Sequence, residues 1–77
     1  MHHTYCYNIV LHLADGSNVL FDSQTYNKRL SEYGINEMLN NCMNECITKT
    51  YLQLHHAIVF TRHIVKIDIE YHEDAYY

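Results

Sequence analysis

The residues best suited to metal binding or catalysis in this chain are its histidines and cysteines, with seven His and three Cys among 77 residues. Both side chains bind zinc, which takes four nitrogen or sulfur ligands. Cys42 and Cys46 lie one helical turn apart, so their thiolates can reach one ion, and His55 with His56, or His63, could complete a tetrahedron. Adjacent histidines on a strand point to opposite faces, however, and the two cysteines share a stripe with apolar residues. We therefore predict no metal and keep a zinc-stabilised module as the alternative.

Nucleophilic catalysis would require a thiol or hydroxyl within hydrogen-bond reach of a base. Cys6 and His12 share one face of a predicted strand, but at strand rise they are separated by about 20 Å. The sequence contains no glycine-rich phosphate loop and no nucleophile elbow. We predict a protein without a catalytic site or cofactor, with a small hydrolase or transferase as the second alternative.

The N-terminal third predicts a β-hairpin. Tyr5 to Leu13 alternates in polarity as a strand does, and a second alternating segment follows. A three-residue loop at residues 14–16 pairs Leu11 with Val19 and keeps both apolar faces together, whereas a two-residue loop does not. This register puts Gly16 in the left-handed conformation that such a loop requires.

The middle of the chain predicts a helix. From Asp22 onward the apolar spacing changes to about three and a half residues. Ser23 or Thr25 is the expected N-cap. Gly34 ends a first helical piece or merely kinks one long helix, and both alternatives stay open. The segment Ile35 to Ile47 is the clearest helical stripe.

The C-terminal third predicts two more strands. Thr50 to Phe60 and Ile64 to Tyr71 both have β composition, and the second alternates strictly between apolar and charged residues. An even-numbered loop, either Arg62-His63 or the four residues Thr61 to Ile64, places Phe60 opposite Val65. The expected fold is therefore α+β: a single domain over residues 1–77, with the order ββαββ, in which one helix covers a four-stranded antiparallel sheet. The order of the strands in the sheet is left open.

The outer face of this sheet is half apolar, which is unusual for a face that water should cover. We interpret it as a candidate surface for binding another protein. Its expected members are Val10, His12, Leu20, Val59, Lys66, Asp68 and Glu70.

Charge narrows the choice of partner. Nine acidic residues outnumber five basic ones, and the net charge of -4 excludes a typical nucleic-acid-binding surface. The last ten residues combine acids with tyrosines, a composition that suits binding to a basic protein surface. The candidates there are Tyr71, Glu73, Asp74 and Tyr76. The alternative for residues 72–77 is a frayed tail.

Size and composition complete these expectations. A chain this short buries only about 60% of its unfolded surface, so a homodimer is a plausible source of additional stability. The longest purely apolar run is Ala57 to Phe60, the chain starts without a signal-like segment, and three cysteines suit reduced thiols. We therefore expect a cytoplasmic protein that does not enter membranes.

In size and style the chain resembles the very small α+β proteins that phages and mobile elements encode to block a host enzyme, anti-CRISPR inhibitors among them. The resemblance rests on a compact acidic chain with eight tyrosines and no catalytic motif. No diagnostic residue string carries it, so it assigns no functional residue. It implies inhibition by contact, in a host cytoplasm if the gene is carried by a phage.

Overall fold

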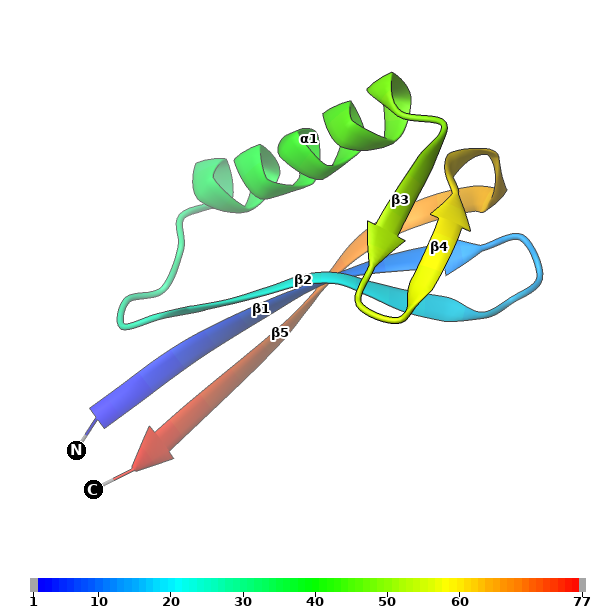
Figure 1. Ribbon diagram of the computed structural model, residues 1–77. Helices are drawn as coiled ribbons and strands as arrows, with labels where there is room; N and C mark the ends of the chain where they lie inside the picture. Colours follow the sequence, from blue (N-terminus) through cyan, green and yellow to red (C-terminus); the bar gives the residue numbers. More distant parts are fainter. Residues whose placement is uncertain (1, 77) are drawn as a thin grey trace.

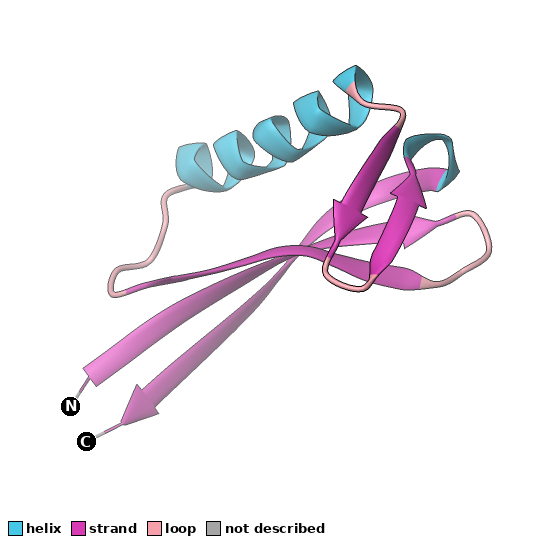
Figure 2. Cartoon of the chain, viewed as in Figure 1, coloured by secondary structure: helices cyan, strands magenta, loops and turns pink. Residues whose placement is uncertain are grey.

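The computed structural model describes residues 2–76 of this small α+β protein. Its elements are, in chain order, β1 (His2–Leu13), β2 (Asn18–Tyr26), α1 (Glu32–Thr48), β3 (Tyr51–Leu54), β4 (Ala57–Phe60) and β5 (Ile64–Tyr76). A 3-10 turn, Thr61–His63, joins β4 to β5. The strands form two antiparallel sheets, one of three strands in the order β2-β1-β5 and one of two strands, β3-β4 (Figures 1 and 2).

The predicted four-stranded sheet is therefore wrong. β5 pairs with β1 along the whole of β1, and in the described part of the chain β3 and β4 pair only with each other. Strand length explains the difference. A strand that runs from Ile64 to Tyr76 needs a long partner for its backbone groups, which β1 supplies and the four-residue β4 cannot.

The short hairpin also reverses the expected side of β4. Its tight turn lies at His55 and His56, where His55 takes the left-handed conformation with a φ of 43°. Leu52 and Val59 are then paired and both turn inward, so Val59 is only 6% exposed. Phe60 points outward and faces Tyr51, and not Val65 as predicted.

The first hairpin agrees with the prediction at its turn but differs from it after the first cross-strand pairs. Leu11 pairs with Val19, and Gly16 has the left-handed φ of 89° that the three-residue loop requires. A bulge leaves Phe21 without a partner on β1, and the strand continues to Tyr26. The predicted start of the helix at Ser23 or Thr25 is wrong for this reason.

The helix is a single piece that begins after Ser31. The Ser31 hydroxyl accepts a hydrogen bond from the backbone N–H of Gly34 at 3.2 Å, so Gly34 lies in the first turn of the helix. It therefore does not end a first helical piece. The predicted stripe is confirmed for Met38, Cys42 and Cys46, whereas Leu39 lies outside the core. Met38 and Cys42 are buried against Tyr7, Ile9, Leu11 of β1 and Leu52 of β3, so helix and short hairpin cover the same face of the large sheet.

The C-terminal end of the described chain belongs to a strand. Residues 72–76 continue β5, where Cys6 pairs with His72 and His2 pairs with Tyr76. Because β2 ends opposite Tyr5, the ends of β1 and β5 at residues 2–4 and 74–76 extend beyond it as a two-stranded arm (Figure 1). Tyr77 lies outside the described residues.

Candidate binding surfaces

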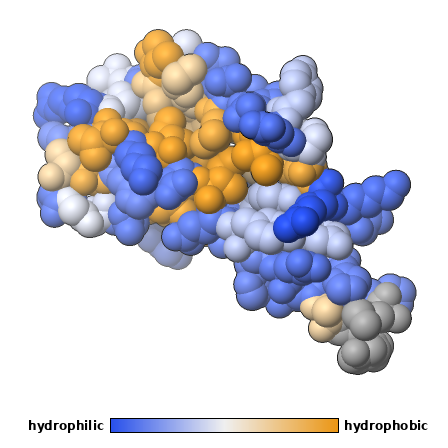
Figure 3. All heavy atoms as spheres, turned by 180° about the vertical axis from the view of Figure 1, so that it is seen from behind, coloured by the Kyte–Doolittle hydropathy of each residue, from blue (hydrophilic) through white to orange (hydrophobic). Residues whose placement is uncertain are grey.

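A groove lined largely by apolar side chains lies between α1 and the start of β5. We call it the apolar groove. Its volume is about 480 Å³, and its apolar lining consists of Leu39, Met43, Cys46, Ile47, Ile64, Val65 and Ile67. Ile47 is 70% exposed and Val65 is 67% exposed. Figure 3 shows this face, on which apolar side chains spread over the body of the molecule.

Local structure explains why these residues are left uncovered. Leu39, Met43 and Ile47 recur every four residues and form one row along α1. On β5, Ile64 pairs with Leu13 and Lys66 pairs with His12, so Val65 is the extra residue of a bulge. The helix row and the bulge thus present apolar side chains to solvent on the same side of the sheet.

The apolar surface ends at an aromatic cluster beside the N-terminus of α1. Tyr71 lies 5.2 Å from Tyr7 between ring centroids, and the Arg29 guanidinium lies 5.3 Å from the Tyr71 ring centroid. The Tyr71 hydroxyl donates to Glu73 Oε2 at 3.3 Å. Burial is the main cause that raises the pKa of Tyr71, and Arg29 opposes it. The tail residues Tyr71 and Glu73 therefore face the helix side, while Asp74 is on the other face.

A second groove, of about 520 Å³, lies between β2 and the opposite side of α1. We call it the polar groove. Its polar lining consists of Asp22, Gln24, Tyr26, Glu37, Asn41 and Glu45, and its floor is formed by Ile9, Phe21, Leu30, Met38 and Cys42 around Gly34. Gln24 Nε2 donates to Asp22 Oδ2 at 2.9 Å, and the Tyr26 hydroxyl donates to Gln24 Oε1. Asp22 Oδ1 accepts from the Ser23 backbone N–H at 2.9 Å.

The outer face of the large sheet holds some of the residues predicted to bind a partner. Leu20 is exposed there, but its cross-strand neighbour Val10 is only 7% exposed. Asp68 Oδ2 lies 3.7 Å from His12 Nε2 and 3.8 Å from Lys66 Nζ. Glu70 and Asp74 lie further along the same face of β5. Val59 does not belong to this face, because β4 is not part of the large sheet.

Tyr76 pairs with His2 at the end of the arm. The predicted outer-face site is thus smaller and more polar than expected. Val59 and Val10 are removed from it by burial, and Tyr71 and Glu73 lie on the opposite face.

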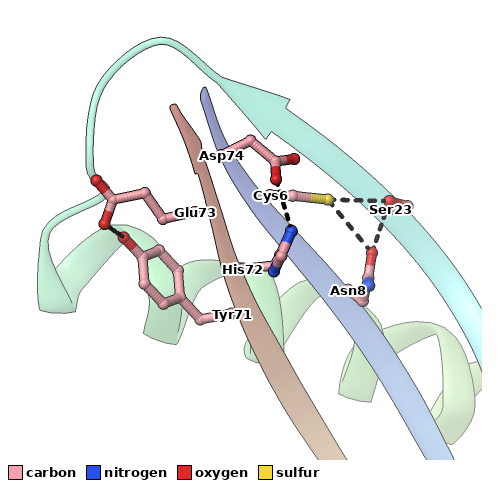
Figure 4. A network of polar contacts seen from close by, with 7 residues as sticks. All are labelled: Cys6, Asn8, Ser23, Tyr71, His72, Glu73 and Asp74. Carbon is pink, nitrogen blue, oxygen red and sulfur yellow. Dashed lines mark hydrogen bonds and ion pairs between the residues drawn. The ribbon is translucent and has the colours of Figure 1, made fainter. Parts of the chain in front are cut away.

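Chain folding creates one Cys, His and Asp arrangement that sequence spacing does not reveal. Cys6 pairs with His72 across β1 and β5, and His72 Nε2 lies 2.8 Å from Asp74 Oδ1 (Figure 4). The Cys6 thiol, however, lies 3.6 Å from both Asn8 Oδ1 and Ser23 Oγ. No hydrogen bond joins Cys6 to His72 in the described structure, so the thiol has no base in contact with it.

Within residues 2–76 the residues of the metal alternative are not gathered into one site. Cys42 is 1% exposed, and burial raises the pKa of its thiol to about 12. Burial also raises the pKa of Cys46. Zinc binds the thiolate, which both sites disfavour. His55 and His56 lie in the exposed β3-β4 turn, and residues 2–76 contain no group of three His, Cys, Asp or Glu side chains placed to hold a metal ion.

Sequence reasoning missed Met43, Ile47 and Val65, because it assigned the helix row to the core and Val65 to a pair with Phe60. One signal was available. The apolar positions of α1 cover a wider arc than a single core-facing stripe needs.

None of the helical segments in the described part of the chain has the length and apolar character to cross a membrane. Comparisons with protein-family models, with curated proteins and with solved structures gave no match to this chain.

Proposed function

We propose that this chain is a non-enzymatic protein–protein interaction module that forms a homodimer and acts by occupying the surface of a target protein. One observation carries the proposal. The chain exposes 5661 Å², whereas a compact monomer of its mass exposes about 4,900 Å². The excess is close to the roughly 800 Å² that one protein buries in an interface of standard size.

The shape supports the same proposal. The radius of gyration is 13.8 Å, against about 11.5 Å for a compact domain of this length. The arm accounts for part of the difference. Among the residues whose burial is described, the core holds eight, all of them apolar or tyrosine. So small a core stabilises the fold weakly, and leaving Ile47 and Val65 in water forgoes further apolar burial.

A second copy of this chain suits the apolar groove. β5 is an edge strand beside the groove, and its segment around Ile67 is self-complementary. In an antiparallel pair centred on Ile67, Lys66 faces Asp68 of the second copy, and apolar residues face each other on the helix side. Such pairing joins two three-stranded sheets and brings the exposed rows of two helices together.

The inhibitory role is supported by the resemblance in size and style to small phage-encoded inhibitors and by the excess of acidic residues. The target in this proposal is a protein with a basic surface, which a net charge of -4 attracts. Blocking a surface requires no assembled nucleophile, which agrees with a Cys6 thiol that contacts Asn8 and Ser23 and, within the described residues, no base.

Sedimentation equilibrium tests the dimer. We expect the natural chain to be a dimer at micromolar concentration, and Ile47→Asp combined with Val65→Asp to weaken association by about 100-fold or more, because two charges would enter the interface. Both side chains are exposed in the monomer, so the far-ultraviolet circular dichroism should stay unchanged.

Leu20→Asp is the matched control, since Leu20 is an exposed apolar residue on the opposite face of the sheet. It should leave the dimer intact. A natural chain that stays monomeric at high concentration, or a control that dissociates as readily as the double variant, would remove this interface.

A further inference from the structure

We propose that the polar groove binds an extended, cationic segment of the target protein, which adds to the free edge of β2 as a further strand. The inference rests on the proposed function as a binding module and names the part of the target that it recognises. It depends on three features of the same place: an unpaired strand edge, a groove of matching length, and a one-sided charge.

The first feature is the edge. Among the strands of residues 2–76, β2 is the last of the sheet on its side and pairs only with β1. Its outward backbone groups are therefore free to pair with another strand, as in proteins that bind peptides by extending a sheet. Asp22, Gln24 and Tyr26 alternate along this edge and turn into the groove, so the side chains of an added strand would meet them there.

The second feature is length. The groove follows α1 from Gly34 to Glu45, a distance of about 17 Å at the rise of an α-helix. An extended chain covers this distance in about five residues. The groove can therefore hold one short strand, with its alternate side chains between β2 and the helix.

The third feature is charge. Asp22, Glu37 and Glu45 line the groove, and its lining contains no Lys or Arg. Lys49 lies 3.6 Å from Glu45, but both side chains are about half exposed, so solvent weakens this pair. Glu37 has no ion pair within the described residues, and it is available to a cation from outside.

Asp22 gives the edge its selectivity. Its carboxylate is held by Gln24 and by the Ser23 backbone, and it faces the helix side of the sheet. A charge that points inward on an edge strand disfavours pairing with apolar strands. A Lys or Arg side chain on the added strand removes that penalty by forming a charge-assisted hydrogen bond. A second copy of this chain does not fit the groove as well, because its own strands carry few basic residues.

Fluorescence anisotropy with a labelled peptide of alternating Lys and Val tests the inference. We expect the natural chain to bind it, and Asp22→Asn combined with Glu37→Gln to weaken binding by about tenfold or more. A peptide of alternating Glu and Val should not bind. The alternating peptide methylated on alternate backbone nitrogens should also fail, because it cannot complete the ladder with β2.

Two controls separate this mode from general attraction between opposite charges. Glu70→Gln combined with Asp74→Asn removes the same charge from the outer face and should change affinity less than twofold. A peptide with the same residues in two blocks, Lys then Val, keeps the charge but loses the alternation, and it should bind more weakly. Equal binding of both peptides, or equal loss in both double variants, would overturn the inference.

The outcomes also distinguish the inference from the homodimer. Peptide binding by a chain that sediments as a monomer would support the polar groove and refute the dimer interface. A stable dimer that binds none of the cationic peptides would refute the polar groove and leave the dimer interface in place.

Discussion

The two sides of α1 form grooves of similar volume and opposite character. Three parallel rows of residues, each with a four-residue repeat, run along the helix. Met38, Cys42 and Cys46 form the row that packs on the sheet. Glu37, Asn41 and Glu45 form the row on the β2 side, whereas Leu39, Met43 and Ile47 form the row on the β5 side.

This difference shows how one short helix can present two separate binding surfaces. Each outer row is one position from the core row, which is about 100° around the helix. Both rows therefore flank the sheet and do not project straight into solvent. Polar residues in one row and apolar residues in the other then suit a charged strand on one side and a second copy of the chain on the other.

The largest expected effect is the loss of both surfaces together when the shared helix is loosened. Met38 is buried in the core row, and Met38→Ala should lower the free energy of unfolding by about 2–5 kcal/mol. Peptide binding and dimerisation should weaken in parallel. Urea unfolding, anisotropy and sedimentation measure the three quantities.

Met43→Ala is the matched control, because Met43 is exposed in the apolar row of the same helix. In the monomeric Ile47→Asp and Val65→Asp background it should change unfolding by less than about 1 kcal/mol. If both methionine variants destabilised the monomer equally, the division of α1 into core and flanking rows would be incorrect.

A smaller effect should follow when the polar β2 side of α1 is made apolar like the β5 side. Asp22→Val removes the inward charge from the edge of β2, so this edge should pair more readily with a strand of another copy. In the monomeric Ile47→Asp and Val65→Asp background, we expect self-association to strengthen by about tenfold or more, and cationic peptide binding to fall. Sedimentation velocity across a concentration series provides the measurement.

Ser23→Val serves as the control on the same strand, since Ser23 bonds to Asn8 on the opposite face of the sheet. It should leave this background monomeric. A monomeric Asp22→Val chain would show that something other than this carboxylate keeps the β2 edge free.

The smallest expected effect is a pH dependence of unfolding that comes from the buried Cys42 thiol on the floor of the polar groove. Burial holds the pKa of the Cys42 thiol at about 12, against 9.0 for an ordinary thiol. The unfolded chain therefore releases this proton at lower pH than the folded chain does. The stabilisation is complete below about pH 9 and is lost as the pH rises toward 12.

From about pH 8 to pH 10 the natural chain should lose about 1 kcal/mol more unfolding free energy than Cys42→Ala does. Cys46→Ala should retain most of this loss, because Cys46 is only partly buried. Identical pH profiles for the natural chain and Cys42→Ala would show that water reaches the core row through the polar groove.

Local pattern predicted the elements better than their assembly. The Gly16 turn, the pairing of Leu11 with Val19 and the helical stripe through Met38 and Cys42 depend on neighbours in sequence, and all are confirmed. The pairing of β5 with β1 depends on residues about 60 positions apart, and period-two alternation is the same for any partner strand.

The errors at the sites have the same origin. Once His55 adopted a left-handed turn, the side chains of β4 changed face, and Val59 moved from the predicted surface to the interior. The polar groove was not predictable, because Asp22 and Glu37 come together only when the helix crosses beside β2. The sequence does contain the acids, but their alignment depends on the bulge at Phe21.

The arm places the first and last described residues side by side, with His2 opposite Tyr76 at its tip (Figure 1). Neither groove includes a residue of this tip. Fluorophores or affinity handles added at either end would therefore report on the module without obstructing its contacts. A short linker between the two ends would also permit a circularly permuted chain that opens at the exposed His55–His56 turn.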